Sequence, residues 1–176
     1  MVRRGQAREP ELVEEKIKFF TVTVTCAAAG DYAANDIMSN SATGDAGVAA
    51  VVVFDSKAAI ALVKQVTAVC SEDSVLNRLR LHFYNYNPAA ADVEMDDNAA
   101  FDFAKNATGA AGYIGSIDLP AFRDGGTSMA VAEANLVDKY LAELTTGTAV
   151  YMVIETLDAE TNETASMTIR FDFYFV

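Results

Sequence analysis

The sequence contains no tryptophan, one histidine and two cysteines among its 176 residues. Cys26 and Cys70 have no CxxC spacing, and secreted disulfide scaffolds are smaller and richer in cysteine, so we expect two buried thiols. A lone His82 needs a nucleophile and an orienting acid before it can act as a general base, and the sequence has neither a G-x-S-x-G nor an H-E-x-x-H motif. We therefore expect a structural role for His82, and neither enzymatic activity nor a cofactor.

Basic residues are scarce as well: 13 lysines and arginines stand against 25 aspartates and glutamates, which gives a net charge of −12. A nucleic-acid-binding surface needs a basic face, so this balance argues against nucleic-acid partners. Long apolar runs are also missing. No stretch reaches the roughly 18 continuous apolar residues of a membrane span, and no signal-peptide core follows Arg3 and Arg4. We expect a soluble protein that is assembled in the cytosol and has no membrane partner.

What the sequence does contain is strand alternation. In residues 18–26, Phe20, Val22 and Val24 alternate with threonines, a period of two that gives a strand two distinct faces. In residues 77–86, leucine and phenylalanine face one side, while His82 lies on a polar face with arginines. Further strands are predicted over residues 47–54, 58–70, 101–103, 113–119, 149–156 and 167–176, the last with an aromatic inner face.

Residues 129–144 are the one helix candidate, because Leu136, Tyr140 and Leu144 fall near helical spacing, and use of part of this segment as a strand is the alternative. About seven to nine strands without a βαβ rhythm predict two packed antiparallel sheets. The expected fold class is therefore all-β, an antiparallel β-sandwich of jelly-roll type with at most one short helix. We expect residues 1–18 to form an N-terminal arm and residues 19–176 to form a single β-sandwich domain.

Residues 92–98 place oxygen-bearing side chains at alternate positions, as at the start of a calcium-binding EF-hand loop. The match fails at both diagnostic places, because the sixth position is Asp97 instead of glycine and the twelfth is Phe103 instead of glutamate. We expect a solvated acidic loop here, with a cation bound between loops as the alternative.

The other chemistry-bearing patterns are weaker. The glycines of residues 109–115 do not match G-x-G-x-x-G and do not lie between a strand and a helix, which argues against a phosphate site. Two carboxyl groups, such as Glu155 with Asp158 or Asp158 with Glu160, would suffice for a glycosidase. A sugar site also needs stacking aromatics, however, and the absence of tryptophan weakens that hypothesis.

Several short segments follow one another in a recognisable order. They are residues 22–25, 36–38, 78–85, 97–101, 113–120 and 151–159. In this order they resemble small virion structural proteins of tailed bacteriophages, over about residues 20 to 176. The resemblance implies a virion component assembled in the host cytoplasm, a capsid decoration (cement) protein. Its implied partners are the major capsid protein and further copies of itself, for which a trimer would suit a position between capsomers.

The resemblance does not include residues 1–18. This segment carries a net charge of +1, against −13 for the rest of the chain. Its basic residues are the candidate partner-binding set: Arg3, Arg4, Arg8, Lys16 and Lys18. A slightly basic arm on an acidic body could dock on an acidic partner, and a frayed terminus is the alternative. Alternative functions are a tail, neck or fibre-associated component and a jelly-roll carbohydrate-binding module or glycan hydrolase.

Overall fold

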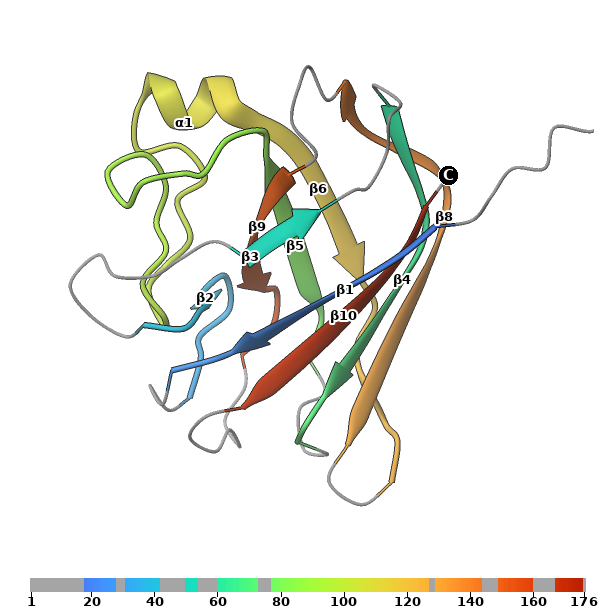
Figure 1. Cartoon of the computed structure of the whole chain (residues 1–176). Helices are drawn as coiled ribbons and strands as arrows, with labels where there is room; N and C mark the ends of the chain where they lie inside the picture. The colour runs from blue at the N-terminus through green and yellow to red at the C-terminus, as the bar shows by residue number, and fades with distance from the viewer. Residues whose placement is uncertain are drawn as a thin grey trace, which may run out of the picture.

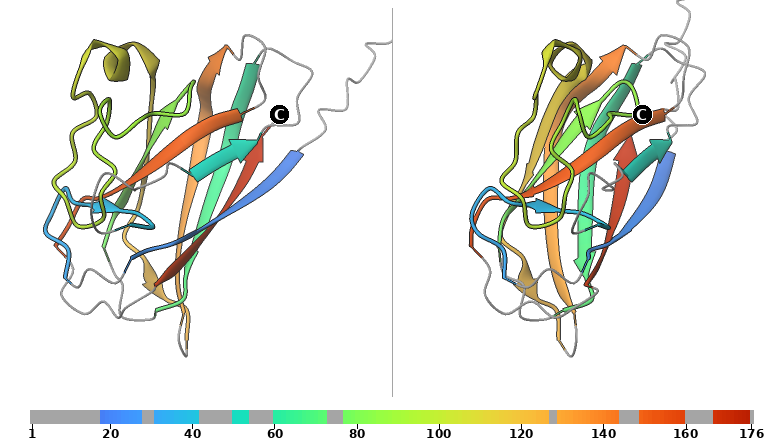
Figure 2. Two further views of the ribbon diagram at one scale, coloured as in Figure 1. Left: turned by 60° about the vertical axis from the view of Figure 1, so that its left-hand side comes forward. Right: turned by 90° about the vertical axis from the view of Figure 1, so that its left-hand side faces the viewer.

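The computed structural model describes residues 18–27, 31–41, 50–53, 60–72, 77–126, 129–143, 149–159 and 167–175. They form two antiparallel sheets that pack face to face (Figures 1 and 2). The first sheet contains, in spatial order, β1 (Lys18–Thr25), β10 (Thr168–Phe175), β4 (Ile60–Cys70), β8 (Ala130–Glu143) and β7 (Arg123–Asp124). The second contains β2 (Ile37–Met38), β9 (Ala149–Thr156), β5 (Leu79–Tyr84) and β6 (Tyr113–Leu119), and β3 (Ala50–Val53) also pairs with β9.

The strand pairings are nested, and this nesting defines the topology. β5 pairs with β6, β4 with β8, β3 with β9 and β1 with β10, each pair antiparallel. The chain is thus one long antiparallel hairpin that is wrapped so that successive pairs fall in alternate sheets. Contacts of β10 with β4 and of β9 with β5 then complete each sheet. A hairpin rolled up in this way is a jelly roll, so the predicted fold class is confirmed.

The main core lies between the two sheets. Ile169, Phe171 and Phe173 of β10 are fully buried, as the aromatic alternation of the last segment predicts. Leu81 and Phe83 of β5 face them from the second sheet, and the rings of Phe83 and Phe173 meet edge to face with centroids 6.2 Å apart. Full burial of side chains of this size stabilises a fold by roughly 1.5–3 kcal/mol each.

The helix predicted over residues 129–144 is wrong, because this segment is strand β8. Ala130, Ala132 and Ala134 are buried and alternate with exposed Glu133 and Asn135, which is a period of two. β8 pairs with β4 along nearly its whole length, so the tertiary pairing overrides the helix preference of alanine and leucine. The helix found in the described residues is α1 (Ala107–Gly112), elsewhere in the chain.

The strand predicted around residues 101–103 is also absent from the described structure, which has only an isolated bridge between Asp36 and Ala100 near this position. The backbone of Phe101 instead donates to the carbonyl of Asn35 at 2.8 Å. The other predicted strands are confirmed within a few residues, and two very short ones, β2 and β7, bring the described total to ten. No helix among the described residues is long and apolar enough to cross a membrane.

Two further expectations concern particular residues. Cys26 and Cys70 are both buried in the main core, as predicted. Of the candidate partner-binding residues, Arg3, Arg4, Arg8 and Lys16 lie outside the described residues, whereas Lys18 is the first residue of β1. The division into an arm over residues 1–18 and a domain over residues 19–176 therefore remains a prediction.

Candidate functional site

The outer face of the second sheet is covered by the crossover segment, defined here as residues 85–112 between β5 and β6 (Figure 1, yellow-green). Between this segment and the sheet lies a second, smaller cluster of buried side chains, to which both contribute: Ile37, Tyr84, Val93, Met95 and Val153. The prediction that His82 lies on a polar outer strand face is therefore wrong in one respect. That face is covered, and only 5% of His82 is exposed.

The crossover segment is held in place by Asn106. Its side-chain oxygen accepts hydrogen bonds from the backbone NH groups of Thr108 and Gly109, which caps the N-terminus of α1. Its amide group donates to Asp92 at 2.8 Å. Gly109 packs so closely on the backbone of Asp92, and Gly112 on the ring of Tyr86, that a Cβ atom at either position would clash. Gly109 and Gly112 therefore serve the close packing of the crossover segment.

The acidic stretch of this segment is not a solvated loop, contrary to expectation. Asp97 is buried and accepts hydrogen bonds from the Tyr32 hydroxyl and the Ser39 backbone NH, both at 2.7 Å. Burial raises the pKa of Asp97 to about 6, although both hydrogen bonds act in the opposite direction. Glu94 forms an ion pair with Lys105 at 2.7 Å. Within the described ranges, no group of three or more potential metal ligands is found.

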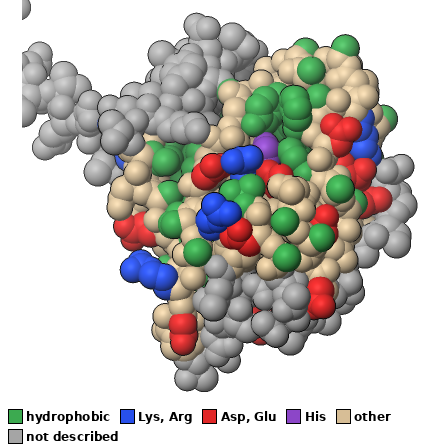
Figure 3. All heavy atoms as spheres, turned by 180° about the vertical axis from the view of Figure 1, so that it is seen from behind, with side chains coloured by type: hydrophobic (Ala, Val, Ile, Leu, Met, Phe, Trp, Pro, Cys, Tyr) green, Lys and Arg blue, Asp and Glu red, His purple; other side chains and the backbone are tan. Residues whose placement is uncertain are grey.

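A pocket of about 290 Å³ opens between the crossover segment and the second sheet. β5, β6 and β9 form its floor, and the crossover segment supplies two aromatic rings to its wall. The lining residues are Arg80, His82, Phe101, Phe103, Tyr113, Ser116 and Glu155. Figure 3 looks onto this face, where the histidine lies among hydrophobic side chains with acidic and basic groups beside it. Side chains from distant parts of the sequence thus converge on a single hollow.

His82 is fixed on every side. Its Nε2 atom lies 2.8 Å from a carboxylate oxygen of Glu155, its Nδ1 atom lies 3.2 Å from the Tyr113 hydroxyl, and the ring of Phe101 stacks on the imidazole at 4.0 Å. Burial lowers the pKa of His82 more than the bond to Glu155 raises it, so the imidazole is neutral at pH 7. Because a carboxylate can only accept, we assign the imidazole proton to Nε2, and Nδ1 then accepts from Tyr113.

Arg80 and Glu155 place opposite charges at the edge of the pocket. Arg80 binds Asp118 through two parallel hydrogen bonds, of 2.6 and 3.0 Å. Its remaining terminal nitrogen, Nη1, lies 3.8 Å from Glu155, too far for a hydrogen bond. Among the described residues, nothing donates to the second carboxylate oxygen of Glu155 or pairs with the Ser116 hydroxyl. The pocket therefore contains a donor, an acceptor and a hydroxyl that a ligand could satisfy.

This arrangement is suited to binding more than to bond cleavage. Both nitrogens of His82 are engaged, so neither is available to take a proton from a nucleophile such as Ser116. The carboxylate pair of Glu155 with Asp158 does not converge on the pocket. Asp158 binds Arg78 in a bidentate pair that lowers its pKa to about 2. Glu160 lies outside the described residues.

Sequence reasoning identified His82 and Glu155 separately but missed the pocket. His82 and Ser116 are directly opposite each other in the β5–β6 register, and Arg80 is opposite Glu155 in the β5–β9 register. Only the register brings these residues together, because they are far apart in the sequence. The alternation over residues 77–86 was the signal that placed Arg80 and His82 on a common face.

Comparisons with known proteins identify no family for the chain. No family model matches it, and no curated protein matches it either. A search of solved structures finds a chain described as "Israeli acute paralysis virus heated to 63 degree - full particle". The match has 10% sequence identity and a TM-score of 0.32, and it covers 91% of this chain and 71% of that chain. The jelly-roll assignment rests on the strand order and register of the present structure, and the resemblance to tailed-phage proteins stays a prediction.

Proposed function

We propose that this chain is a non-enzymatic structural protein of a virus particle, specifically a decoration protein that binds and reinforces the outer shell of a tailed-phage capsid. The observation that carries the proposal is the nested jelly roll, an architecture that viral shell proteins use repeatedly. The order of segments 22–25 to 151–159 supports the same role. Lectins also use this fold, and the tests below distinguish the two roles.

The proposed contacts lie at the edge of the first sheet. β1 is the outermost strand of this sheet, and Lys18 begins it. An edge strand has backbone groups that another chain can pair with. The basic residues Arg3, Arg4, Arg8 and Lys16 precede it in the sequence and would reach an acidic surface of the major capsid protein. Further copies of the chain are the second proposed partner, and the virion is the proposed location.

The copy number in purified virions tests the proposed role. Quantitative mass spectrometry should find this chain at a simple ratio to the major capsid protein, because a decoration protein follows the symmetry of the shell. A handful of copies per particle would instead support the tail, neck or fibre alternative. Absence from particles, together with clear binding on a glycan array, would support a carbohydrate-binding module and overturn the virion role.

Deletion of residues 1–16 tests the arm separately. The shortened chain should bind capsids at least tenfold more weakly than the full chain when occupancy is measured on shells that lack the protein. A charge-reversal control, in which Arg3, Arg4 and Arg8 are replaced by glutamate, should lose binding to a similar extent. Unchanged occupancy for both variants would contradict the role of the arm, while the copy-number result would still stand.

A further inference from the structure

We propose that the pocket around His82 binds a saccharide, with Phe103 and Tyr113 packing on the sugar ring and Arg80, Ser116 and Glu155 bonding its hydroxyl groups. Saccharide binding at this pocket does not depend on the virion role, because particle incorporation and sugar binding are measured separately. The inference rests on the aromatic wall, on the polar atoms without partners and on the balance of charge.

The aromatic wall provides the apolar half of the site. Phe103 is 48% exposed and its ring lies 5.3 Å from that of Tyr113, so the two rings form a pair at the wall of the pocket. Phe101 covers His82 and thereby fixes the floor of the pocket. The C–H face of a pyranose packs well on the electron-rich face of an aromatic ring. Phenylalanine and tyrosine therefore supply a stacking surface in a chain that has no tryptophan.

The polar atoms provide the other half. Arg80 Nη1 is a charged donor that lies 3.8 Å from Oε2 of Glu155, the oxygen that His82 also contacts, and the other carboxylate oxygen of Glu155 is a charged acceptor on the same group. Two neighbouring sugar hydroxyls match this pair, because one can accept from the guanidinium while the other donates to the carboxylate. Ser116 can donate or accept and adds a third contact. Hydrogen bonds of His82 hold Glu155 in the required position.

The charge balance excludes other ligand classes. A cation in the pocket would be repelled by the Arg80 guanidinium at its edge. An anion would be repelled by the Glu155 carboxylate, and the charge of Arg80 would attract it only weakly because Asp118 already pairs with that charge. A wholly apolar ligand would remove Arg80 and Glu155 from water without giving them hydrogen bonds, which is costly. A neutral ligand with an apolar face and several hydroxyl groups matches both the aromatic rings and the polar groups that line the pocket.

The single histidine makes the pocket directly observable. His82 is the only histidine in the chain, so its imidazole signals in NMR spectra report on this site alone. The full chain is titrated with methyl glycosides of glucose, galactose, mannose and N-acetylglucosamine, and separately with choline chloride as a cationic probe. At least one glycoside should shift the His82 signals in a saturable way, with a Kd on the order of millimolar, and choline should not.

Matched variants locate the binding. Phe103→Ala should weaken glycoside binding at least tenfold, because it removes the exposed stacking ring. Phe19→Ala, which removes a comparably exposed ring from the first sheet, should leave binding unchanged. Ser116→Ala leaves both aromatic rings in place and removes one hydroxyl contact, so it should weaken binding severalfold. The proposal is overturned if no glycoside shifts the His82 signals, if choline shifts them instead, or if Phe19→Ala weakens binding as much as Phe103→Ala.

Discussion

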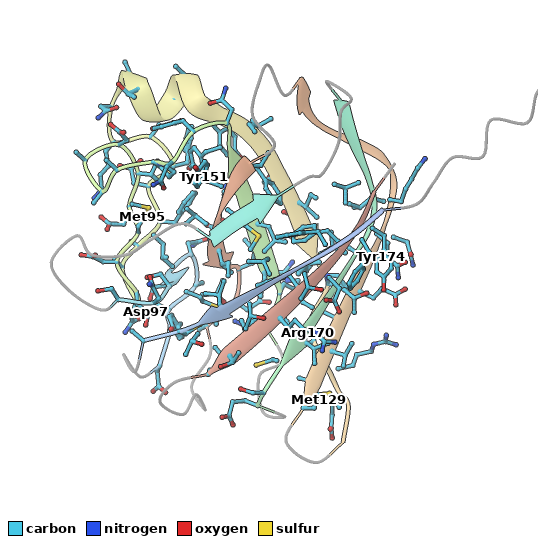
Figure 4. All side chains as sticks on the ribbon, viewed as in Figure 1. Met95, Asp97, Met129, Tyr151, Arg170 and Tyr174 are labelled. Atoms are coloured by element: carbon cyan, nitrogen blue, oxygen red, sulfur yellow. The ribbon has the colours of Figure 1, made fainter. Side chains whose placement is uncertain are left out.

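The two sheets contribute similarly to the main core, but their outer faces differ completely. The outer face of the second sheet lies beneath the crossover segment, and its outward residues His82, Tyr84 and Val153 are buried. The outer face of the first sheet is open over β1, where Phe19 is 57% exposed, and over most of β10, where Asp172 is buried. Figure 4 shows both: Met95 and Asp97 lie on the covered side, and Arg170 and Tyr174 lie on the first sheet.

The difference is reflected in how polar side chains find partners. On the open face, Asp172 has one partner on the neighbouring strand and one on its own strand: Thr21 of β1 donates to its carboxylate at 2.7 Å, and Arg170 of β10 lies 3.2 Å from it. On the covered side, Asp97 is bonded by Tyr32 and by the backbone of Ser39, which precede it by more than 50 residues. A covered face needs every polar group to be bonded by the protein itself, because water is not available to replace a missing partner.

The largest expected effect is the difference in stability loss when one tyrosine is truncated on the outer face of each sheet. Tyr84→Ala should lower the free energy of unfolding by about 3–5 kcal/mol, because Tyr84 is fully buried and its hydroxyl donates to the carbonyl of Phe103 at 3.0 Å. Tyr174→Ala, on the open face, should cost less than about 1 kcal/mol. Urea denaturation of both variants measures the difference. Equal losses would show that the crossover segment does not seal its face.

The second effect concerns pH. Because the pKa of Asp97 is raised to about 6 in the folded chain, the folded state holds a proton that the unfolded state has already lost. The contribution of Asp97 to stability is therefore present below about pH 4 and is lost as the pH rises to about 6, by at most about 3 kcal/mol. Asp97→Asn should abolish this decline in denaturation curves measured across that range. A decline of the same slope in the variant would assign it to other groups.

The smallest effect is expected on the open face. Thr21→Val removes the hydroxyl that donates to Asp172 while preserving the branched shape that suits a strand. The cost should be about 0.5–1 kcal/mol, since Arg170 still pairs with the carboxylate that is left. Thr23→Val, also exposed on β1, is the control and should be close to neutral. A loss above about 2 kcal/mol for Thr21→Val would mean that this face is less open than described.

Strand positions were predictable from the sequence where one face is buried and the other is not. Residues 18–26 and 167–176 alternate cleanly, and both were placed correctly. Residues 129–144 misled because alanine and leucine fit both periods, and only the pairing with β4 decides between them. His82 was assigned to the correct strand, but its burial depends on Phe101 and the rest of the crossover segment. No local sequence pattern predicts that this strand face is covered, because the covering residues pack on it from another part of the chain.

The nested pairing also has consequences for how the chain folds. The innermost pair, β5 with β6, joins strands separated by one crossover segment, whereas the outermost pair joins Lys18 to Phe175. Contacts between such distant residues carry a large loop-closure cost, and folds dominated by them form in roughly milliseconds to seconds. We expect assembly to proceed outward from β5–β6, with β1 and β10 joining last. On the ribosome, β1 would then have to wait without its partner until β10 emerges, so this jelly roll can close only after residues 18–175 have all been synthesised.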